Sequence, residues 1–458
     1  MKVAFVNQPI DTIIPPGQGS VGACTYGVAN ILAKSCDVVV YGAKSSNQAH
    51  GSEVSAHGVK YKFFTTARSD RWLFEARTKY SRLAPSAPPI STSSMLYPSF
   101  AKQVAMDLQR QACDVIHIQH CSQCVPVIRE YNPTAKIVLH LHAEWFSQGD
   151  SRVFERRLKD VDLVTAVSGY VAEKTRRDFP AIADRCEVMY NGIDSREFVR
   201  EKDYRVSQDR PKRILYAGAI SPHRGLHVLL EAFKIVVKRY PNVCLDLVGP
   251  EGNYALQETF DIKDGALRRS VAPYYVFKPM SFLKAKLFPS SLNRATYRSH
   301  LEGMMPAEVS ERVTFHGWVR HRAQLIGHYY AGDIFVLPSI CNDSFGIPVV
   351  EAMAAGCPVV ASRSGGVVET VKDRDTGFIV EKNDPQQLAH MLLRLLEDDE
   401  LREKMGRAGR ERALAKFTWD MVAEAMLARY RSLSGFSPLI PTEASPGPLE
   451  YASANVES

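Results

Sequence analysis

The 458-residue sequence has no run of eighteen or more apolar residues, so it contains no predicted transmembrane helix. Its first residues, MKVAFVNQPI, have the pattern of a β-strand and lack the long apolar region and cleavage site of a signal peptide. The nine cysteines are an odd number and stand singly, apart from Cys121 and Cys124, which favours reduced thiols and leaves no second pair for a zinc site. We therefore expect a cytoplasmic protein that is at most peripheral to the inner face of a membrane.

A large excess of charge is also absent, because the net charge is only +7 at pH 7. Most of that excess lies between residues 261 and 300, which hold eight lysines and arginines against two aspartates. Such a local segment indicates an anionic partner or surface rather than a generally basic protein. No helix-turn-helix, RNA-recognition or zinc-finger signature accompanies it, so we expect no nucleic-acid partner.

Short apolar runs rich in β-branched residues alternate with longer amphipathic runs, which is the pattern of a parallel, doubly wound sheet. In the first half of the chain the strand-like runs are residues 2–7, 37–42, 114–119, 136–142 and 162–168. After a polar stretch the pattern restarts, with runs at 213–220, 244–249, 312–317, 334–339, 358–362 and 377–380. The sequence thus predicts two α/β domains with a cleft between them, where ligands bind beyond the carboxyl ends of the strands.

The domain limits follow from this alternation. We expect an N-terminal Rossmann-like domain over residues 1–200 and a C-terminal one over 201–415, with a basic, aromatic insertion at about 253–311. A closing helix over 416–433 is predicted to pack back on the N-terminal domain. The tail at 434–458 is rich in Ser, Pro, Gly and Ala and is predicted to be disordered.

The loop after the first strand is rich in glycine. In QPIDTIIPPGQGSVGACTYGVANIL, the glycines Gly17, Gly19 and Gly22 let the backbone come close to a ligand, and the N-terminus of the following helix favours an anion. The spacing has the letters of the dinucleotide-binding fingerprint, but about ten residues separate it from the strand. The sequence is compatible with two interpretations, a phosphate-binding loop and a plain flexible loop.

A second strand-to-helix loop carries a basic residue. In LYAGAISPHRGLHVLLEAF a strand ends at Gly218, the loop holds His223 and Arg224, and Gly225 begins a helix. An arginine at a helix N-terminus beyond a strand can bind a diphosphate with two parallel hydrogen bonds. The alternative is an ordinary loop arginine that is simply solvated.

Two carboxylates stand eight positions apart in NDSFGIPVVEAMAAGCPVVAS. Asp343 lies in the turn after the buried strand DIFVLPS, and Glu351 lies on the following helix among apolar neighbours, where it needs a partner. Between them, Phe345 and Gly346 can turn backbone amides toward an anion. Ionised carboxylates only accept hydrogen bonds, which suits the hydroxyls of a sugar and a ribose joined by a diphosphate. The alternative makes Asp343 a turn residue or helix cap and Glu351 an exposed helix residue.

These residues closely resemble the signature of the retaining glycosyltransferases of family 4, which have the GT-B architecture. The family signature is Glu, seven residues and Glu, with SFG after the first Glu and EAMAxGxPVV at the second. The strings GGVVE, TGFIV, EVMYNGIDSREF and ERVTFHGWV extend the resemblance over most of the chain. The resemblance implies the GT-B fold, in which two doubly wound Rossmann-like domains face each other across a cleft. It also implies that the domain over 1–200 is the acceptor side and that the domain over 201–415 binds the nucleotide sugar.

The resemblance makes Asp343, Arg224 and His142 the candidate catalytic residues. Asp343 would face hydroxyls of the donor sugar, and Glu351 would hold the ribose hydroxyls. Arg224, at the family's lysine position, would bind the diphosphate and stabilise the leaving group. The turn between the carboxylates would present its backbone to the sugar and diphosphate at Ser344, Phe345, Gly346 and Ile347.

Three further regions complete the implied site. Gly17 and Gly19 would approach the diphosphate from the N-terminal domain. His142, in VLHLHAEW, matches the histidine that ends a family strand at the sugar-binding face. The stretch from Gly317 to Val319 would pass near the base.

Two positions depart from the family pattern. Ala219 stands where the family usually has arginine, so one of two basic diphosphate ligands is missing. Asp343 is one methylene shorter than glutamate, which moves its acceptor oxygens by about 1.5 Å. We expect Arg224 to compensate in part through bidentate binding, and the shorter acid either to retune donor choice or to weaken the enzyme.

The implied activity is metal-independent transfer, with retention, of a sugar from a UDP- or GDP-type nucleotide sugar to an acceptor hydroxyl. We expect a hexosyltransferase that uses no cofactor and serves carbohydrate or glycoconjugate biosynthesis, with a sugar, a lipid-linked molecule or a small molecule as its acceptor. The alternatives are a nucleotide-sugar 2-epimerase on the same fold and a sugar-nucleotide-binding protein with weakened catalysis. The extended carboxylate block and the NGID segment favour transfer.

Two basic stretches are interleaved with aromatic residues. One, at 271–299, lies in the connection over 251–311, which is typically short in the family; the other, at 68–90, lies in the domain where the resembling enzymes receive the acceptor. Such a mixture suits docking on an anionic membrane or a lipid-linked acceptor. Proline interrupts both stretches and neither is a clean amphipathic helix, so ordered lids or subunit contacts are the alternative.

Overall fold

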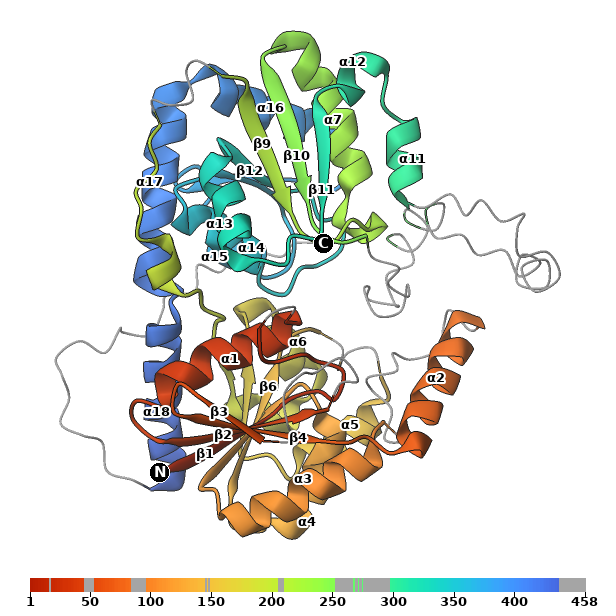
Figure 1. Cartoon of the computed structure of the whole chain (residues 1–458), viewed down its shortest axis with the longest axis vertical. Coiled ribbons are helices and arrows are strands. Elements are labelled where there is room, and N and C mark those ends of the chain that lie inside the picture. The colour runs from red at the N-terminus through yellow and green to blue at the C-terminus, as the bar shows by residue number, and fades with distance from the viewer. Residues whose placement is uncertain are drawn as a thin grey trace.

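The described residues form two lobes. The computed structural model describes residues 1–15, 18–44, 53–83, 96–144, 149–204, 210–251 and 297–435, with the single residues 146, 267, 271 and 274. Figure 1 shows one lobe above the other, each built on a sheet with helices packed against it. The lower lobe comes from the first half of the chain and the upper lobe from the second, except that the last helix returns to the lower lobe.

The N-terminal lobe is built on an eight-stranded sheet with the order β3-β4-β2-β1-β5-β6-β7-β8. All neighbouring strands are parallel except β3 and β4, which form an antiparallel hairpin at one edge. The central strands are buried on both faces, so they read as continuous apolar runs. The strands are β1 (Lys2–Val6), β2 (Asp37–Ala43), β3 (Glu53–Ala56), β4 (Val59–Phe64), β5 (Val115–Gln119), β6 (Lys136–Leu141), β7 (Leu163–Ala166) and β8 (Cys186–Val188).

Amphipathic helices cover this sheet. Helix α3, for example, buries Phe100, Val104 and Leu108 completely, and this four-residue spacing places all three on one face. The helices are α1 (Ser20–Leu32), α2 (Arg68–Leu83), α3 (Pro98–Gln111), α4 (Val125–Tyr131), α5 (Ser151–Leu158) and α6 (Gly169–Asp178), with the 3-10 turns η2 (Ser122–Cys124) and η4 (Pro180–Arg185).

The C-terminal lobe is built on a parallel six-stranded sheet with the order β11-β10-β9-β12-β13-β14. The chain moves outward from β9 to β11 and then restarts on the other side of β9, so the strand order reverses between β9 and β12. In open parallel sheets, ligands bind beyond the carboxyl ends of the strands at such a reversal. The strands are β9 (Lys212–Ala217), β10 (Val243–Val248), β11 (Val313–Gly317), β12 (Ile334–Leu337), β13 (Val359–Ser362) and β14 (Gly377–Val380).

The second sheet has helices of its own, and a linker turn precedes it. The helices are α7 (Leu226–Arg239), α11 (Tyr297–Gly303), α12 (Ala307–Ser310), α13 (Arg322–Ala331), α14 (Ile347–Ala354), α15 (Val367–Thr370), α16 (Pro385–Glu397) and α17 (Asp399–Lys416). The 3-10 turn η5 (Ser195–Phe198) lies in the connection between the lobes, and η7 (Pro222–Arg224) precedes α7.

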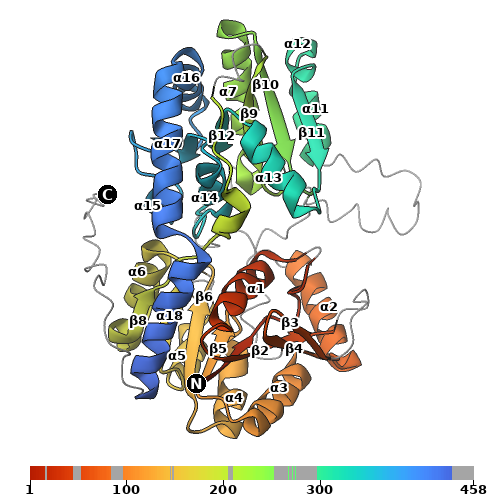
Figure 2. The ribbon, with the colours of Figure 1, turned by 60° about the vertical axis from the view of Figure 1, so that its left-hand side comes forward.

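The last two helices run from one lobe to the other. Figures 1 and 2 show α17 along the C-terminal lobe and α18 (Trp419–Ser434) continuing down the side of the N-terminal lobe, where it packs on α1. At the crossing, the N–H of Ile193 donates to the carbonyl of Phe417 at 2.8 Å, and the N–H of Trp419 donates to the carbonyl of Ile193 at 3.0 Å. The two segments that cross between the lobes are therefore paired.

A carboxylate also joins the lobes. Glu369, on α15, accepts hydrogen bonds from the backbone N–H groups of Gly169 and Tyr170 at 2.7 and 2.8 Å. A helix N-terminus leaves such N–H groups without partners in the helix, so Glu369 caps α6 of the other lobe. Burial raises the pKa of Glu369 above its ordinary value, and these hydrogen bonds limit the rise.

The predicted alternation of strands and helices is confirmed, and each predicted strand is present. The sequence did not reveal β3, β4 or β8, because β3 and β8 are very short and β4 exposes a lysine, Lys60. The expectation of a fully parallel first sheet was wrong at this edge, where β3 pairs antiparallel with β4. Within the described ranges, no helix has the length and apolar character needed to cross a bilayer. Most of the predicted insertion, and the predicted tail beyond Gly435, lie outside the described residues.

A buried hydrogen bond ties α18 to the first sheet and gives a testable prediction. Tyr430 Oη lies 2.7 Å from Nδ1 of His117, a buried residue of β5 whose pKa burial lowers to about 3. Replacing Tyr430 by Phe leaves the imidazole nitrogen without this partner, so we expect Tyr430→Phe to lower the free energy of unfolding by about 1–3 kcal/mol. A urea titration followed by circular dichroism measures the effect. The control is Tyr131→Phe at the half-buried end of α4; equal midpoints for the two variants would contradict the prediction.

Candidate active site

The loop that carries Arg224 is pressed against the end of β12. Gly225 begins α7 with a φ of 71°, and a Cβ on it would lie 2.0 Å from the carbonyl oxygen of Pro338. Only glycine satisfies both the positive φ and the close approach. The N–H of Ile340 also donates to the carbonyl of His223 at 3.1 Å. These contacts place Arg224 beside the turn that follows β12.

Arg224 forms an ion pair with Asp343, which comes from that turn. Burial alone would lower the pKa of Arg224, but the Asp343 carboxylate raises it overall, so the guanidinium stays charged. The backbone of Asp343 is held as well, since its N–H donates to Ser364 Oγ at 2.8 Å and its carbonyl accepts from Gly366 N at 2.8 Å. The two candidate catalytic groups therefore contact each other directly.

The second carboxylate, Glu351, is buried on α14 with 8 % of its side-chain surface exposed. Two groups from α13 contact it: Arg322 Nη1 donates to Oε1 at 2.5 Å, and Tyr329 Oη donates to Oε2 at 2.7 Å. Burial would lower the pKa of Arg322, but Glu351 raises it overall. Burial first, and Glu351 second, hold the pKa of Tyr329 well above its ordinary value, so the phenol remains a donor. The partner that the sequence requires for Glu351 is thus a pair of residues.

The turn between the carboxylates is anchored from the interlobe crossing. The ring of Phe345 is buried, with its centroid 5.9 Å from that of Tyr190 and 5.6 Å from that of Phe417. Gly346 begins α14 with a φ of 83°. Ser344 and Ile347 flank them, half-buried, and a Cβ on Gly366 would lie 2.2 Å from the carbonyl of Ser344. The backbone expected to face the donor is therefore rigidly supported.

The position of Ala219 and the expected base region lie at neighbouring strand ends. The carbonyl of Ala219 accepts a hydrogen bond from Tyr216 Oη at 2.7 Å. On the next strands, the N–H of Gly249 donates to the carbonyl of Gly317 at 2.9 Å. Val319 is half-buried against the core, and its neighbour Trp318 is 51 % exposed with Arg320 stacked on its ring. An exposed aromatic ring at this place can stack on a base.

The glycine-rich loop of the N-terminal lobe is only partly described, because Gly17 lies outside the described residues. Gly19 is the residue before α1, and a Cβ on it would lie 3.1 Å from Oδ1 of Asp11. Gly22 must be small because a Cβ on it would lie 2.1 Å from the carbonyl oxygen of Thr12 in the same loop. At Gly19 and Gly22 the absent side chains thus make room for the loop itself.

His142 follows β6 and belongs to a cluster of neutral imidazoles. Its Nε2 lies 2.7 Å from Oε1 of Gln119, and its backbone N–H donates to Nδ1 of His120 at 3.0 Å. Burial, with smaller effects from His140 and His120, holds the pKa of His142 well below its ordinary value. A neutral imidazole can exchange hydrogen bonds with a hydroxyl, but it is not a charged acid at neutral pH.

Among the described residues, no group of three or more His, Cys, Asp or Glu side chains is arranged so that it could hold a metal ion. The sequence contains Asp-x-Asp triplets at 160–162, where Asp162 pairs with Arg129, and at 373–375. The second triplet lies in the turn before β14, where Asp373 Oδ1 accepts from the N–H of Ile379 at 2.8 Å and Asp375 pairs with Lys372 at 3.1 Å. These contacts give the second triplet a role in the turn.

Comparison with known families identifies the chain. The sequence model described as "Glycosyltransferase Family 4" matches residues 40–197, and the one described as "Glycosyl transferases group 1" matches residues 303–412. The two matches fall on the two lobes, and the second includes both carboxylates. The chain is a glycosyltransferase of the GT-B type and belongs to family 4.

Known proteins with similar chains agree with this assignment. The glycosyltransferase is 23 % identical over 448 residues to spore coat protein SA of Bacillus subtilis, covering 94 % of this chain and 99 % of the relative. The structure of trehalose-6-phosphate from E. coli bound with UDP-2-fluoro glucose superposes with a TM-score of 0.67 at 14 % identity, covering 96 % of this chain and all of that one. HepE of Anabaena in complex with UDP superposes with a TM-score of 0.63 at 20 % identity, covering 94 % of this chain and all of that one. At these identities, the two structures establish the shared GT-B fold.

Sequence reasoning assigned no role to several residues that contact the carboxylates of this glycosyltransferase. Arg322 and Tyr329 contact Glu351, and Glu197 of the linker contacts Arg322. The only signal in the sequence was the carboxylate on an apolar helix, which requires a partner without saying which one. The pairing of Arg224 with Asp343 had no local signal, because 119 positions separate the two residues.

A half-buried acid in the N-terminal lobe, Asp11, has a buried Oδ2 without a hydrogen-bond partner among the described residues, and it predicts how the stability of the glycosyltransferase depends on pH. Burial raises the pKa of Asp11 from 3.8 to about 7. Between these pH values the unfolded chain loses the Asp11 proton while the folded protein keeps it, so this group reduces stability as the pH rises from about 4 to about 7. Above pH 7 the full destabilisation remains, and it amounts to at most about 4 kcal/mol, because one pKa unit corresponds to about 1.4 kcal/mol.

Asp11→Asn should therefore raise the urea midpoint at pH 8 and leave it unchanged at pH 4. Asparagine has the same shape as aspartate but no charge to bury. The matched control is Asp184→Asn at an exposed position of η4, which should give the same small effect at both pH values. A gain from Asp11→Asn that does not depend on pH would contradict the role of its ionisation.

Proposed function

We propose that this glycosyltransferase is a retaining, metal-independent hexosyltransferase that takes a UDP- or GDP-type nucleotide sugar as donor and a hydroxyl as acceptor. One observation carries the proposal: two carboxylates near the carboxyl end of β12 are each contacted by an arginine, with the turn at 344–347 between them. A nucleotide sugar presents hydroxyl, diphosphate and hydroxyl groups in the same order.

The contacts of Glu351 leave room for a ribose diol. An ionised carboxylate has about four acceptor sites, two on each oxygen. Arg322 uses one site on Oε1 and Tyr329 uses one on Oε2. About one site on each oxygen remains, which matches the two neighbouring hydroxyls of a ribose.

Arg224 likewise has hydrogen-bond donors that the protein itself does not occupy. A guanidinium has five N–H donors, and the contact with Asp343 occupies Nη1. Nε is buried and has no hydrogen-bond partner among the described residues, while 28 % of the side-chain surface is exposed. The remaining donors suit a diphosphate, whose developing charge an arginine stabilises as the sugar departs.

The proposed reaction breaks the bond between the anomeric carbon and the diphosphate oxygen and forms a bond from the acceptor oxygen to the same carbon, on the same face. The acceptor proton passes to the departing diphosphate. Asp343 lies beside Arg224, so it can orient the guanidinium as well as contact the donor sugar. The neutral ring of His142 serves as a hydrogen-bonding partner for a hydroxyl on the sugar-binding face.

Two structures with the same fold support the choice of donor, because HepE of Anabaena is in complex with UDP and the E. coli structure is bound with UDP-2-fluoro glucose. The acceptor is proposed only as a hydroxyl on a sugar, a lipid-linked molecule or a small molecule. A 2-epimerase would invert the configuration at C2 of the donor sugar without an acceptor hydroxyl and without net release of nucleoside diphosphate, whereas a binding protein with weakened catalysis would bind the donor and leave it unchanged. Nucleoside diphosphate release with and without acceptor, together with the C2 configuration of the recovered donor, therefore separates the three functions.

The decisive experiment combines nucleotide binding with turnover. Purified protein is incubated with a panel of UDP- and GDP-sugars and cell-extract acceptors, with and without EDTA, and release of nucleoside diphosphate is measured with the anomeric configuration of the product. We expect acceptor-dependent release, insensitivity to EDTA and retained configuration. Donors that bind without any release would refute the transferase.

Glu351→Gln should weaken binding of the nucleoside diphosphate about tenfold or more, because a hydrogen bond to a charged group contributes about 1.5–3 kcal/mol. Calorimetry measures the affinity. The control is Glu381→Gln at an exposed ion pair with Arg363, which should leave the affinity unchanged. Unchanged affinity in Glu351→Gln would remove its assigned role.

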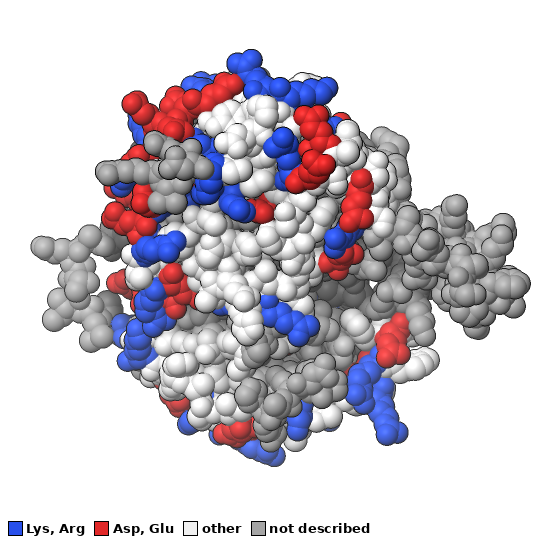
Figure 3. Space-filling model, turned by 45° about the horizontal axis from the view of Figure 1, so that its top comes forward, with Lys and Arg blue, Asp and Glu red and all other residues white. Residues whose placement is uncertain are grey.

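We also propose that helix α2 contacts an anionic membrane or a lipid-linked acceptor. Trp72 is 67 % exposed on this helix, and Arg68 and Arg71 beside it are exposed as well. A tryptophan inserts at a bilayer interface, and each nearby cationic side chain adds about 1 kcal/mol on an anionic surface. On the face in Figure 3, described acidic and basic side chains are interspersed, so this proposal rests on the local helix and on no large basic patch there.

Trp72→Ala should reduce co-sedimentation with anionic liposomes about tenfold at low salt, since burying a large apolar side chain contributes about 1.5–3 kcal/mol. Neutral liposomes should recover little of either protein. Met421→Ala, which removes a 40 % exposed apolar residue of α18, is the control. Equal recovery on anionic and neutral vesicles would exclude this contact.

A further inference from the structure

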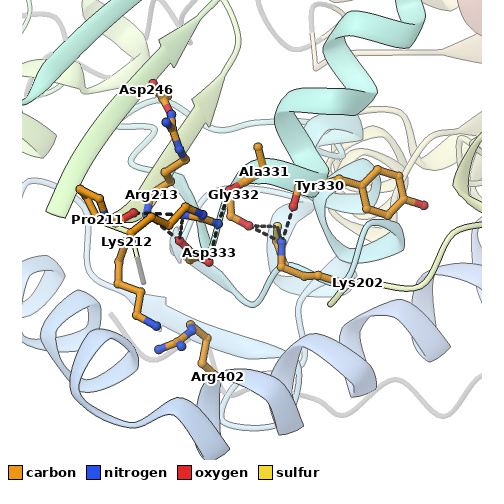
Figure 4. Close-up of polar contacts among 12 residues, drawn as sticks. Lys202, Pro211, Lys212, Arg213, Asp246, Tyr330, Ala331, Gly332, Asp333 and Arg402 are labelled. Atoms are coloured by element: carbon orange, nitrogen blue, oxygen red, sulfur yellow. Dashed lines mark hydrogen bonds and ion pairs between the residues drawn. The ribbon is translucent and has the colours of Figure 1, made fainter. Parts of the chain in front are cut away.

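The linker between the lobes, defined as residues 191–204, contacts both helices that form the carboxylate site at Glu351. On α14, Tyr204 Oη donates to the carbonyl of Gly356, just beyond the helix end, at 2.8 Å. On α13, Lys202 Nζ donates to the carbonyl of Tyr330 at 2.8 Å, near the end of the helix (Figure 4). The linker is thus fastened along the two helices that supply Glu351 and its partners.

A single guanidinium joins this linker to Glu351. Nη1 of Arg322 lies 2.5 Å from Oε1 of Glu351, whereas Nε and Nη2 lie 2.8 and 2.7 Å from Oε2 of Glu197, in η5. A guanidinium is planar and rigid, so one arginine fixes the two carboxylates relative to each other. Both acids compete for the same positive charge.

Glu197 lies close to the point where the chain crosses between the lobes. Ile193, four residues earlier, is paired through its backbone with Phe417 and Trp419 of the other crossing segment. Phe198, the next residue after Glu197, packs on Tyr330, and its carbonyl accepts from Arg410. A movement of one lobe relative to the other therefore acts on the turn that holds Glu197.

We propose that Arg322 is a positioning residue that couples the ribose site at Glu351 to the interlobe linker at Glu197. The inference rests on the proposed function, in which Glu351 accepts hydrogen bonds from the ribose diol. When the diol donates hydrogen bonds to the free acceptor sites of Glu351, the balance of the Arg322 interactions with Glu351 and Glu197 changes. The position of the linker turn that holds Glu197 then changes with it. Occupancy of the ribose site and the relative position of the lobes are then linked, and by reciprocity each favours the other.

The test compares two ligands on four proteins. The proteins are wild type, Glu197→Gln, Arg322→Lys and, as a control, Glu201→Gln at an exposed linker position. The ligands are the nucleoside diphosphate that wild type binds, UDP or GDP, and its 2′,3′-dideoxy analogue, which lacks the ribose hydroxyls. Calorimetry gives the ratio of the two affinities, and small-angle X-ray scattering gives the change in radius of gyration on binding.

We expect the ratio of affinities to fall about fivefold in Glu197→Gln and in Arg322→Lys, and to stay at the wild-type value in Glu201→Gln. The ligand-induced change in radius of gyration should shrink in the same two variants. A purely structural role would lower the urea midpoint but leave the ratio unchanged, because it weakens both ligands equally. An unchanged ratio in both variants, with wild type still binding nucleotide, overturns the coupling alone. Binding of neither UDP nor GDP by wild type overturns the proposed function together with it.

Discussion

The buried carboxylate of Glu351 is the constraint around which the candidate site is arranged. It stands on an apolar helix, where a charge without a partner would cost several kcal/mol. Arg322 and Tyr329 remove that cost by contacting one oxygen each, which requires α13 to lie beside α14 in one register. Arg322 also donates a hydrogen bond through Nε to Glu197, so the path of the interlobe linker depends on the same buried charge of Glu351.

Close backbone approaches, rather than long side chains, bring the other charged pair together. Cβ atoms at Gly225 and Gly365 would lie 2.0 and 2.4 Å from the carbonyl oxygens of Pro338 and Asp343, so only glycine permits these contacts. The turns after β9, β12 and β13 are thereby pressed into one cluster. Arg224 and Asp343 meet in this cluster as a consequence of the packing.

The two lobes differ in the chemistry of their candidate site residues. The C-terminal lobe supplies ionised groups paired with each other, which suits a charged donor. The N-terminal lobe supplies neutral imidazoles at His120 and His142, whose pKa values burial holds low, which suits hydroxyls. The cap that Glu369 places on α6 and the paired crossing segments at Ile193 join the two lobes.

The sequence by itself determined the α/β fold and the family, because parallel strands buried on both faces must be apolar throughout, and because the carboxylate block is long and specific. It singled out Asp343, Glu351 and Arg224 as candidates, yet it missed the edge hairpin, in which β3 has only four residues and β4 alternates buried with more exposed side chains. Only the tertiary structure decided which arginine serves which carboxylate. The reason is that these contacts depend on strand order and on backbone approaches between distant turns, which no local pattern of residues records.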